Sequence, residues 1–221
     1  MARRRPARRA EEVGFDSFWL PDHLLYRFPG VHPQGAWDAW SLLAALAATT
    51  RTLEIGPLVA CSSFRNPALI AKMVDTIDEI SGGRLILGLG AGWHEPEYTA
   101  FGFPYDHRVS RFEEALQIVT ALLRTGQVDF AGEYYTAREC ELRPRGPRPE
   151  GPPILVGGSG ERMLRLAARY GDAWNADRQN DVAAVQALNT RVDRACHDVG
   201  RDPASLARVI GIQVDLLNES R

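Results

Sequence analysis

The sequence predicts an α/β fold in which helices cover a parallel sheet. Strand and helix signals alternate along most of the 221 residues. The predicted strands are short and almost continuously apolar, and most are followed by segments with apolar residues at helical spacing. Strands of this kind are buried on both faces, as in parallel sheets. A doubly wound sheet and a (β/α)8 barrel both satisfy the pattern.

The first half of the chain contains clear start and stop signals. Asn66 followed by Pro67 marks a helix start, because asparagine caps the first turn and proline fits within it. The pair Gly82-Gly83 ends that helix. Pro57 predicts a bulge or an irregular end in its strand. We expect helices at residues 7–13, 37–50 and 66–81, and strands at 17–20, 53–60 and 84–90.

In the second half of the chain, strand and helix signals alternate again after an interruption by a hairpin and a loop. Ser110 is a helix cap, with Glu113 in capping-box position and Gly126 after the end. Residues 128–135 are typical of a hairpin, and the Pro/Arg-rich segment 143–153 is a loop. We expect helices at 110–123, 161–170 and 181–199, and strands at 153–156, 172–176 and 208–217.

Composition restricts the class of protein. A formal charge of -2 and a pI near 6.2 argue against nucleic-acid binding. The three cysteines are odd in number and widely spaced, which favours a reducing compartment. No apolar stretch approaches a membrane span. We expect one soluble, cytoplasmic domain over residues 1–221, with the basic residues 1–6 disordered or a non-native start, and no metal site.

The strongest functional signal is the segment 82–98, where an apolar strand enters a glycine-rich loop and then an aromatic-acidic stretch. Glycine lets backbone approach a flat or phosphorylated ligand closely. The segment fails the dinucleotide fingerprint, because Trp93 occupies the place of the last glycine and Pro96 delays any helix. By itself it fits a cofactor site or a tight turn equally well.

Distinctive residues follow four of the predicted strands. The carboxyl ends of parallel strands share one face, where ligands bind in both candidate architectures. We therefore expect a single site there, built from Asp22-His23, the segment after Val59, Gly88–Glu97 and Gly157–Gly160.

Several motifs resemble those of the bacterial luciferase-like monooxygenase superfamily, in order, over residues 8–217. The sequence of these motifs is most similar to that of the branch that depends on coenzyme F420, a deazaflavin, whereas sister branches use FMN. The motifs are Glu11–His23, Arg65–Lys72, Gly82–Tyr98, Arg111–Glu114, Gly132–Tyr135, Pro153–Arg162 and Asp172–Asn175.

The resemblance implies a TIM (β/α)8 barrel with the flavin-like ring at its C-terminal mouth. His23 is similar to the residue proposed as base or hydrogen-bond partner, and Asp22 would lie beside the ring. A non-prolyl cis peptide bond is implied near residues 58–60. We assign Asp22, His23 and Glu97 as catalytic, and as cofactor-binding Val59, Cys61, Gly90, Ala91, Gly92, Trp93, Gly157, Gly158, Ser159 and Gly160.

Each of these residues has an alternative explanation. His23 could cap a helix or hydrogen-bond in the barrel rim, and residues 157–160 could form an ordinary strand-to-helix turn. Trp93 could be a buried rim residue. Glu97 could be an acid, a base or a salt-bridge partner, and Cys61 is expected to pack rather than to act as a nucleophile.

The chain departs from the family pattern in two respects. The deazaflavin-dependent glucose-6-phosphate dehydrogenases of this superfamily carry a glutamate where this sequence has Trp93, which argues against sugar-phosphate oxidation by their mechanism. A barrel typically needs about 250 residues, and the first and last strands have no counterpart among the predicted ones. We expect a truncated gene product or a partner chain that covers the gap.

Our leading hypothesis is an oxidoreductase that transfers a hydride between C5 of coenzyme F420 and a small organic substrate. One alternative is an FMN-dependent monooxygenase supplied by a partner reductase. Another is a catalytically silent fragment. We expect a small-molecule substrate and a homodimer as a possible assembly, with no nucleic-acid or membrane partner.

Overall fold

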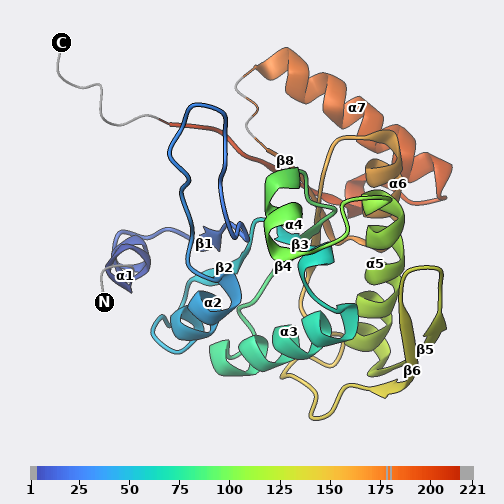
Figure 1. The fold of residues 1–221 in the computed structure, drawn as a ribbon, viewed down its shortest axis with the longest axis horizontal. Coiled ribbons are helices and arrows are strands. Elements are labelled where there is room, and N and C mark those ends of the chain that lie inside the picture. The colour runs from blue at the N-terminus through green and yellow to red at the C-terminus, as the bar shows by residue number, and fades with distance from the viewer. Residues whose placement is uncertain (1–3, 178, 180, 215–221) are drawn as a thin grey trace. The chain divides into compact units, whose positions relative to one another are not determined.

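The computed structural model describes residues 4–177, 179 and 181–214 (Figure 1). The chain forms two compact units, Met1–Ile154 and Leu155–Arg221. None of the helices in the described ranges has both the length and the apolar character that a bilayer crossing requires.

The first unit contains parallel strands and five α-helices. β1 pairs in parallel with β2, and β3 with β4, while Ile55 bridges to Leu85 beside β4. The strands are β1 (Ser17–Leu20), β2 (Glu54–Pro57), β3 (Ala60–Cys61), β4 (Leu87–Gly90), β5 (Gln127–Ala131) and β6 (Thr136–Glu141). The helices are α1 (Arg4–Glu12), α2 (Ala39–Ala47), α3 (Pro67–Ser81), α4 (Glu95–Phe101) and α5 (Arg108–Thr125), with a 3-10 turn at Ser62–Phe64.

The strand expected at residues 53–60 is interrupted. β2 ends at Pro57, as the proline predicted, and β3 resumes at Ala60. The peptide bond between Leu58 and Val59 is cis. This confirms the position that the family resemblance implied.

Helix α3 has the caps that its sequence predicted. The side chain of Asn66 accepts hydrogen bonds from the backbone N–H groups of Ala68 (2.9 Å) and Leu69 (3.3 Å). Gly82 ends the helix in the left-handed region, at φ 68°. The buried face of α3, which includes Ile70 and Val74, anchors it to the core.

Helix α5 corrects one expectation. It begins at Arg108, with His107 in the cap position at φ 50°, so Ser110 lies within the first turn instead of capping it. The hairpin is confirmed as the antiparallel pair β5–β6, which lies along α5 (Figure 1). The carboxylate of Glu114 accepts hydrogen bonds from the backbone N–H groups of residues 133–135 and so fixes the hairpin turn to the helix.

The second unit is a parallel three-stranded segment with two α-helices. β7 pairs with β8 and β8 with β9. Helix α6 has the predicted bounds, whereas β9 ends at Ile210, and residues 215–217 of the expected strand lie outside the described residues. The elements are β7 (Ile154–Gly157), α6 (Glu161–Tyr170), β8 (Ala173–Ala176), α7 (Val182–Asp198) and β9 (Ala207–Ile210), with a 3-10 turn at Pro203–Ser205.

The start of the chain differs from the expectation of disorder over residues 1–6. Helix α1 begins at Arg4, so residues 4–6 are helical, while residues 1–3 lie outside the described residues. Glu11, near the end of this helix, accepts hydrogen bonds from the backbone N–H groups of Arg51, Thr52 and Leu53 at 2.6–3.1 Å. One carboxylate therefore fastens α1 to the turn that precedes β2.

These hydrogen bonds predict a pH-dependent stability. They lower the pKa of Glu11 to about 2, the bond to Thr52 contributing most. Because the folded pKa is depressed, the stabilisation is present above pH ~4.5 and is lost as pH falls toward 2. We expect Glu11→Gln to cost about 1 kcal/mol at pH 7 and nothing near pH 2, since the site is well exposed. Urea unfolding at both pH values measures the difference, and an equal cost at each would contradict the assignment.

Candidate active site

His23 and Glu97 form a hydrogen-bonded pair in the first unit. His23 follows β1, Glu97 lies in α4, and Nδ1 of His23 is 2.7 Å from Oε1 of Glu97. The other oxygen of Glu97 accepts hydrogen bonds from the backbone N–H groups of Leu24 (2.5 Å) and Leu25 (3.1 Å). The Glu97 side chain is 1% exposed and that of His23 is 21% exposed.

This geometry fixes the tautomer of His23. A carboxylate only accepts hydrogen bonds, so Nδ1 of His23 carries the proton when Glu97 is ionised. In the neutral imidazole, Nε2 is then left as an acceptor, and it makes no hydrogen bond with the described residues. A histidine held in this way can take a proton from a bound hydroxyl group.

Asp22 also follows β1, but its side chain is buried, at 1% exposure. Its Oδ2 accepts hydrogen bonds from the backbone N–H of Cys61 (3.1 Å) and from Nη1 of Arg65 (2.8 Å). Its Oδ1 is buried and has no hydrogen-bond partner among the described residues. Arg65 continues to Asp38, the cap of α2, at 2.9 Å. The structure therefore gives Asp22 a place in a partly buried ion-pair network that links three segments.

Burial raises the pKa of Asp22 to about 6 in spite of the Arg65 guanidinium. Because the folded pKa lies above the unfolded one, ionisation destabilises the fold, and the cost grows from about pH 4 and is complete above pH 6. We expect the stability of the protein relative to Asp22→Asn to fall by about 2–3 kcal/mol between pH 4 and pH 7. Denaturant unfolding of both proteins measures this change, and a constant difference would contradict it.

Aromatic rings surround the accessible edge of His23. The centroid of its ring is 4.4 Å from that of Tyr26 and 5.5 Å from that of Trp93. Phe28 lies 6.4 Å from Trp93, with the planes inclined by 24°. The buried His94 holds the loop that carries Tyr26 and Phe28, because its Nε2 accepts a hydrogen bond from the backbone N–H of residue 27 at 3.1 Å.

Cys61 is held in the interior. Its Sγ is 3.0 Å from Oη of Tyr98, which donates to the carbonyl of Ala91 at 2.9 Å. Burial raises the pKa of the Cys61 thiol to about 11, so it stays protonated and is a poor nucleophile. Gly92 packs against the same pair, because a Cβ at this position would lie 2.0 Å from Oη of Tyr98.

The other residues assigned in the first unit line the ends of β3 and β4. Val59 follows the cis peptide bond, and Gly90 is the last residue of β4. Trp93 begins the aromatic stretch and is 54% exposed, which contradicts the alternative of a buried rim residue. The structure thus brings Glu97 and Trp93 into contact with His23, whereas Cys61 contacts Asp22 and Tyr98.

Gly157–Gly160 lies in the second unit, between β7 and α6. Gly160 occupies the cap position of α6 and makes no side-chain cap hydrogen bond. Arg191 donates to the carbonyl of Ser159 (2.7 Å) and pairs with Glu161 (2.7 Å). An open helix N-terminus beside an arginine suits a phosphate group.

The family model for luciferase-like monooxygenases matches residues 3–219. This chain belongs to that family. The family contains TIM-barrel enzymes, and the α/β fold of the chain matches theirs.

The relatives include reductases, dehydrogenases and monooxygenases. The chain is 36% identical to 5,10-methylenetetrahydromethanopterin reductase from Archaeoglobus fulgidus, over 74% of this chain and 45% of the relative. It is 36% identical to F420-dependent glucose-6-phosphate dehydrogenase from Amycolatopsis mediterranei, over 75% and 50%. It is 34% identical to pyrimidine monooxygenase RutA from Enterobacter cloacae, over 80% and 51%. The chain spans about half the length of these relatives.

A solved structure supports the fold over almost the whole chain. The F420-dependent secondary alcohol dehydrogenase in complex with an F420–acetone adduct has a TM-score of 0.82 and 26% identity. It covers 94% of this chain, which corresponds to 63% of that enzyme. EDTA monooxygenase from Chelativorans sp. BNC1, at 22% identity and a TM-score of 0.80, shares the fold.

Sequence reasoning missed several residues that position the site. Arg65 stands in a motif that carried the family resemblance, directly before Asn66, yet only the structure shows that it pairs with Asp22. Tyr26 and Phe28 lie in a loop without regular periodicity, so no pattern placed them beside His23. Arg191 lies in α7 and its contact with Ser159 depends on the packing of α7 against α6.

Proposed function

We propose that this chain belongs to an oxidoreductase that transfers a hydride between coenzyme F420 and a small neutral organic substrate. The observation that carries the proposal is the buried Glu97 carboxylate at Nδ1 of His23, which leaves Nε2 as an acceptor without a partner among the described residues, at an aromatic edge. Relatives that use F420 support it, including the secondary alcohol dehydrogenase.

The residues of the chain have distinct roles in this proposal. When bound, F420 supplies a two-electron hydride acceptor or donor. His23 takes the proton of the substrate hydroxyl at Nε2 during oxidation and returns it during reduction. Glu97 orients the imidazole through its hydrogen bond to Nδ1. The aromatic rings of Tyr26 and Trp93 lie beside the imidazole.

The second unit suits the phosphate of either cofactor. The helix α6 begins after Gly160, a cap residue that makes no side-chain hydrogen bond, and a helix N-terminus presents backbone N–H groups to a phosphate. Around Gly160 an added Cβ would meet nothing within 4 Å, so this end of the helix is open to a ligand. Ser159 adds a hydroxyl group, and Arg191 adds positive charge near Glu161.

The identity to pyrimidine monooxygenase favours a second candidate, an FMN-dependent monooxygenase. The two candidates differ in their reaction with oxygen, since reduced deazaflavins react poorly with it. Oxygen uptake with reduced FMN therefore separates them.

Equilibrium titration tests the proposal. We expect F420 fluorescence to change on binding with a micromolar or lower Kd, and FMN to bind at least about tenfold more weakly. Arg191→Ala should weaken F420 binding, because it removes positive charge at the proposed phosphate end. Tighter binding of FMN with oxygen uptake would establish the alternative, and binding of neither cofactor would contradict both.

A further inference from the structure

Trp93 and Phe28 form an exposed apolar wall beside the free edge of His23. Their side chains belong to two segments, the start of the α4 region and the loop after β1, and their residues are 54% and 44% exposed. The hydroxyl group of Tyr105 donates to the backbone carbonyl of Trp93 at 3.1 Å. This bond holds the backbone of Trp93 in place although its indole faces outward.

The wall consists of closely spaced aromatic rings. The rings of Trp93 and Phe28 are inclined by only 24°, and the ring of His94 lies 5.0 Å from each. Large exposed aromatic groups cost free energy in water and mark surfaces that bind a ligand or a partner. A polar or anionic substrate gains little from such a wall, whereas a planar apolar group can stack on it.

The ring of His23, whose Nε2 makes no hydrogen bond with the described residues, lies beside this wall. Its ring centroid lies 5.5 Å from that of Trp93, in an edge-to-face arrangement. A ligand that stacks on Trp93 can therefore present one hydroxyl or carbonyl oxygen to His23. Both interactions are used together by a molecule with an apolar planar body and a single oxygen function.

We propose that Trp93, supported by Phe28, determines substrate specificity and selects neutral alcohols or carbonyl compounds with a planar apolar body. This inference rests on the proposed function, because it makes His23 the group that meets the reacting oxygen. It assigns Trp93 to the substrate, whereas the sequence assigned it to the cofactor.

Binding of benzyl alcohol to the protein without cofactor tests the inference. The protein carries 13C,15N-labelled histidine, and the ring signals of His23 are followed by NMR during the titration. We expect these signals to shift with a millimolar Kd, and sodium benzoate and glucose 6-phosphate to leave them unchanged at the same concentrations. Trp93→Ala should raise the Kd for benzyl alcohol at least about fivefold, and Trp93→Phe about twofold.

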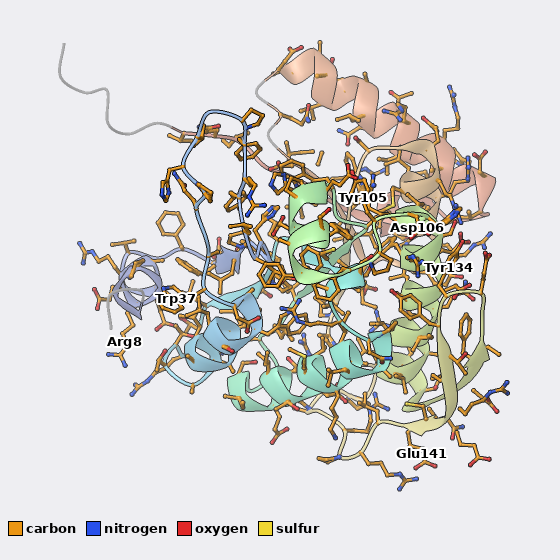
Figure 2. All side chains as sticks on the ribbon, in the orientation of Figure 1. Arg8, Trp37, Tyr105, Asp106, Tyr134 and Glu141 are labelled. Carbon is orange, nitrogen blue, oxygen red and sulfur yellow. The ribbon has the colours of Figure 1, made fainter. Side chains whose placement is uncertain are left out.

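Trp37→Ala is the matched control, because Trp37 is another exposed tryptophan, at 72%, and is labelled beside α1 and α2 in Figure 2, away from Tyr105. It should leave the Kd unchanged. An unchanged Kd in Trp93→Ala, or equal binding of benzoate, would overturn the inference. So would dissociation of a dimer in Trp93→Ala with no effect on benzyl alcohol, which would make the wall an interface between copies. Cofactor titration is a separate measurement, so its failure and the failure of this test are distinguishable.

Discussion

Gly88→Ala is expected to lower the free energy of unfolding by about 3 kcal/mol or more. A Cβ at this position would lie 2.1 Å from the carbonyl oxygen of Pro57 and 3.1 Å from Cγ1 of Val59. Both Gly88 and Pro57 are buried strand residues, so neither segment can move away cheaply. The loss of stability comes from steric overlap and not from backbone strain, since Gly88 has no positive φ. Urea unfolding followed by circular dichroism measures it.

Gly35→Ala is the matched control for this substitution. A Cβ there would meet only the carbonyl oxygen of Leu24, at an ordinary 3.8 Å. We expect a change below about 0.5 kcal/mol. If Gly88→Ala unfolded at the same urea concentration as Gly35→Ala, β4 would not approach Pro57 as closely as the structure has it.

Gly88 also shows what a glycine pattern cannot tell. The glycine-rich segment predicts a place where backbone approaches a ligand. At Gly88 the close neighbour is the backbone of Pro57, and at Gly92 it is the side chains of Tyr98 and Cys61. Glycine indicates that something approaches closely, but the sequence does not say whether that is a ligand or the protein itself.

The elements that the sequence predicted best are those with local signals. The cap at Asn66 and the stop at Gly82 define α3 through contacts within a few residues, and the structure confirms both. The cap expected at Ser110 was wrong because the helix extends to Arg108. His107 occupies the cap position in a left-handed conformation, which no local preference for serine reveals.

The same distinction between local signals and tertiary contacts applies to the site. His23 and Glu97 were both candidates from the sequence, but they are separated by 74 positions. Their hydrogen bond depends on α4 folding back over the loop after β1, which is a tertiary contact. The three roles left open for Glu97 therefore could not be separated until its two oxygens were placed.

Glu97→Gln is expected to leave the fold intact and to reverse the tautomer of His23. The amide oxygen of glutamine would accept the hydrogen bonds from the N–H groups of Leu24 and Leu25, which face one carboxylate oxygen. The amide NH2 group would then donate to Nδ1 of His23, and the proton would move to Nε2. His23 would present a donor where the reaction needs an acceptor, so kcat for alcohol oxidation should fall about 100-fold.

Two measurements separate this effect from a loss of structure. The 15N shifts of the His23 ring report which nitrogen carries the proton, and reduction of F420 with benzyl alcohol reports the rate. Glu95→Gln is the control, because Glu95 lies in the first turn of the same helix but is exposed, and it should change neither. Glu97→Ala, which leaves three donors without an acceptor, should also lose about 3 kcal/mol of stability. A wild-type rate in Glu97→Gln with the tautomer reversed would mean that His23 does not exchange the proton, and would leave it a role in binding alone.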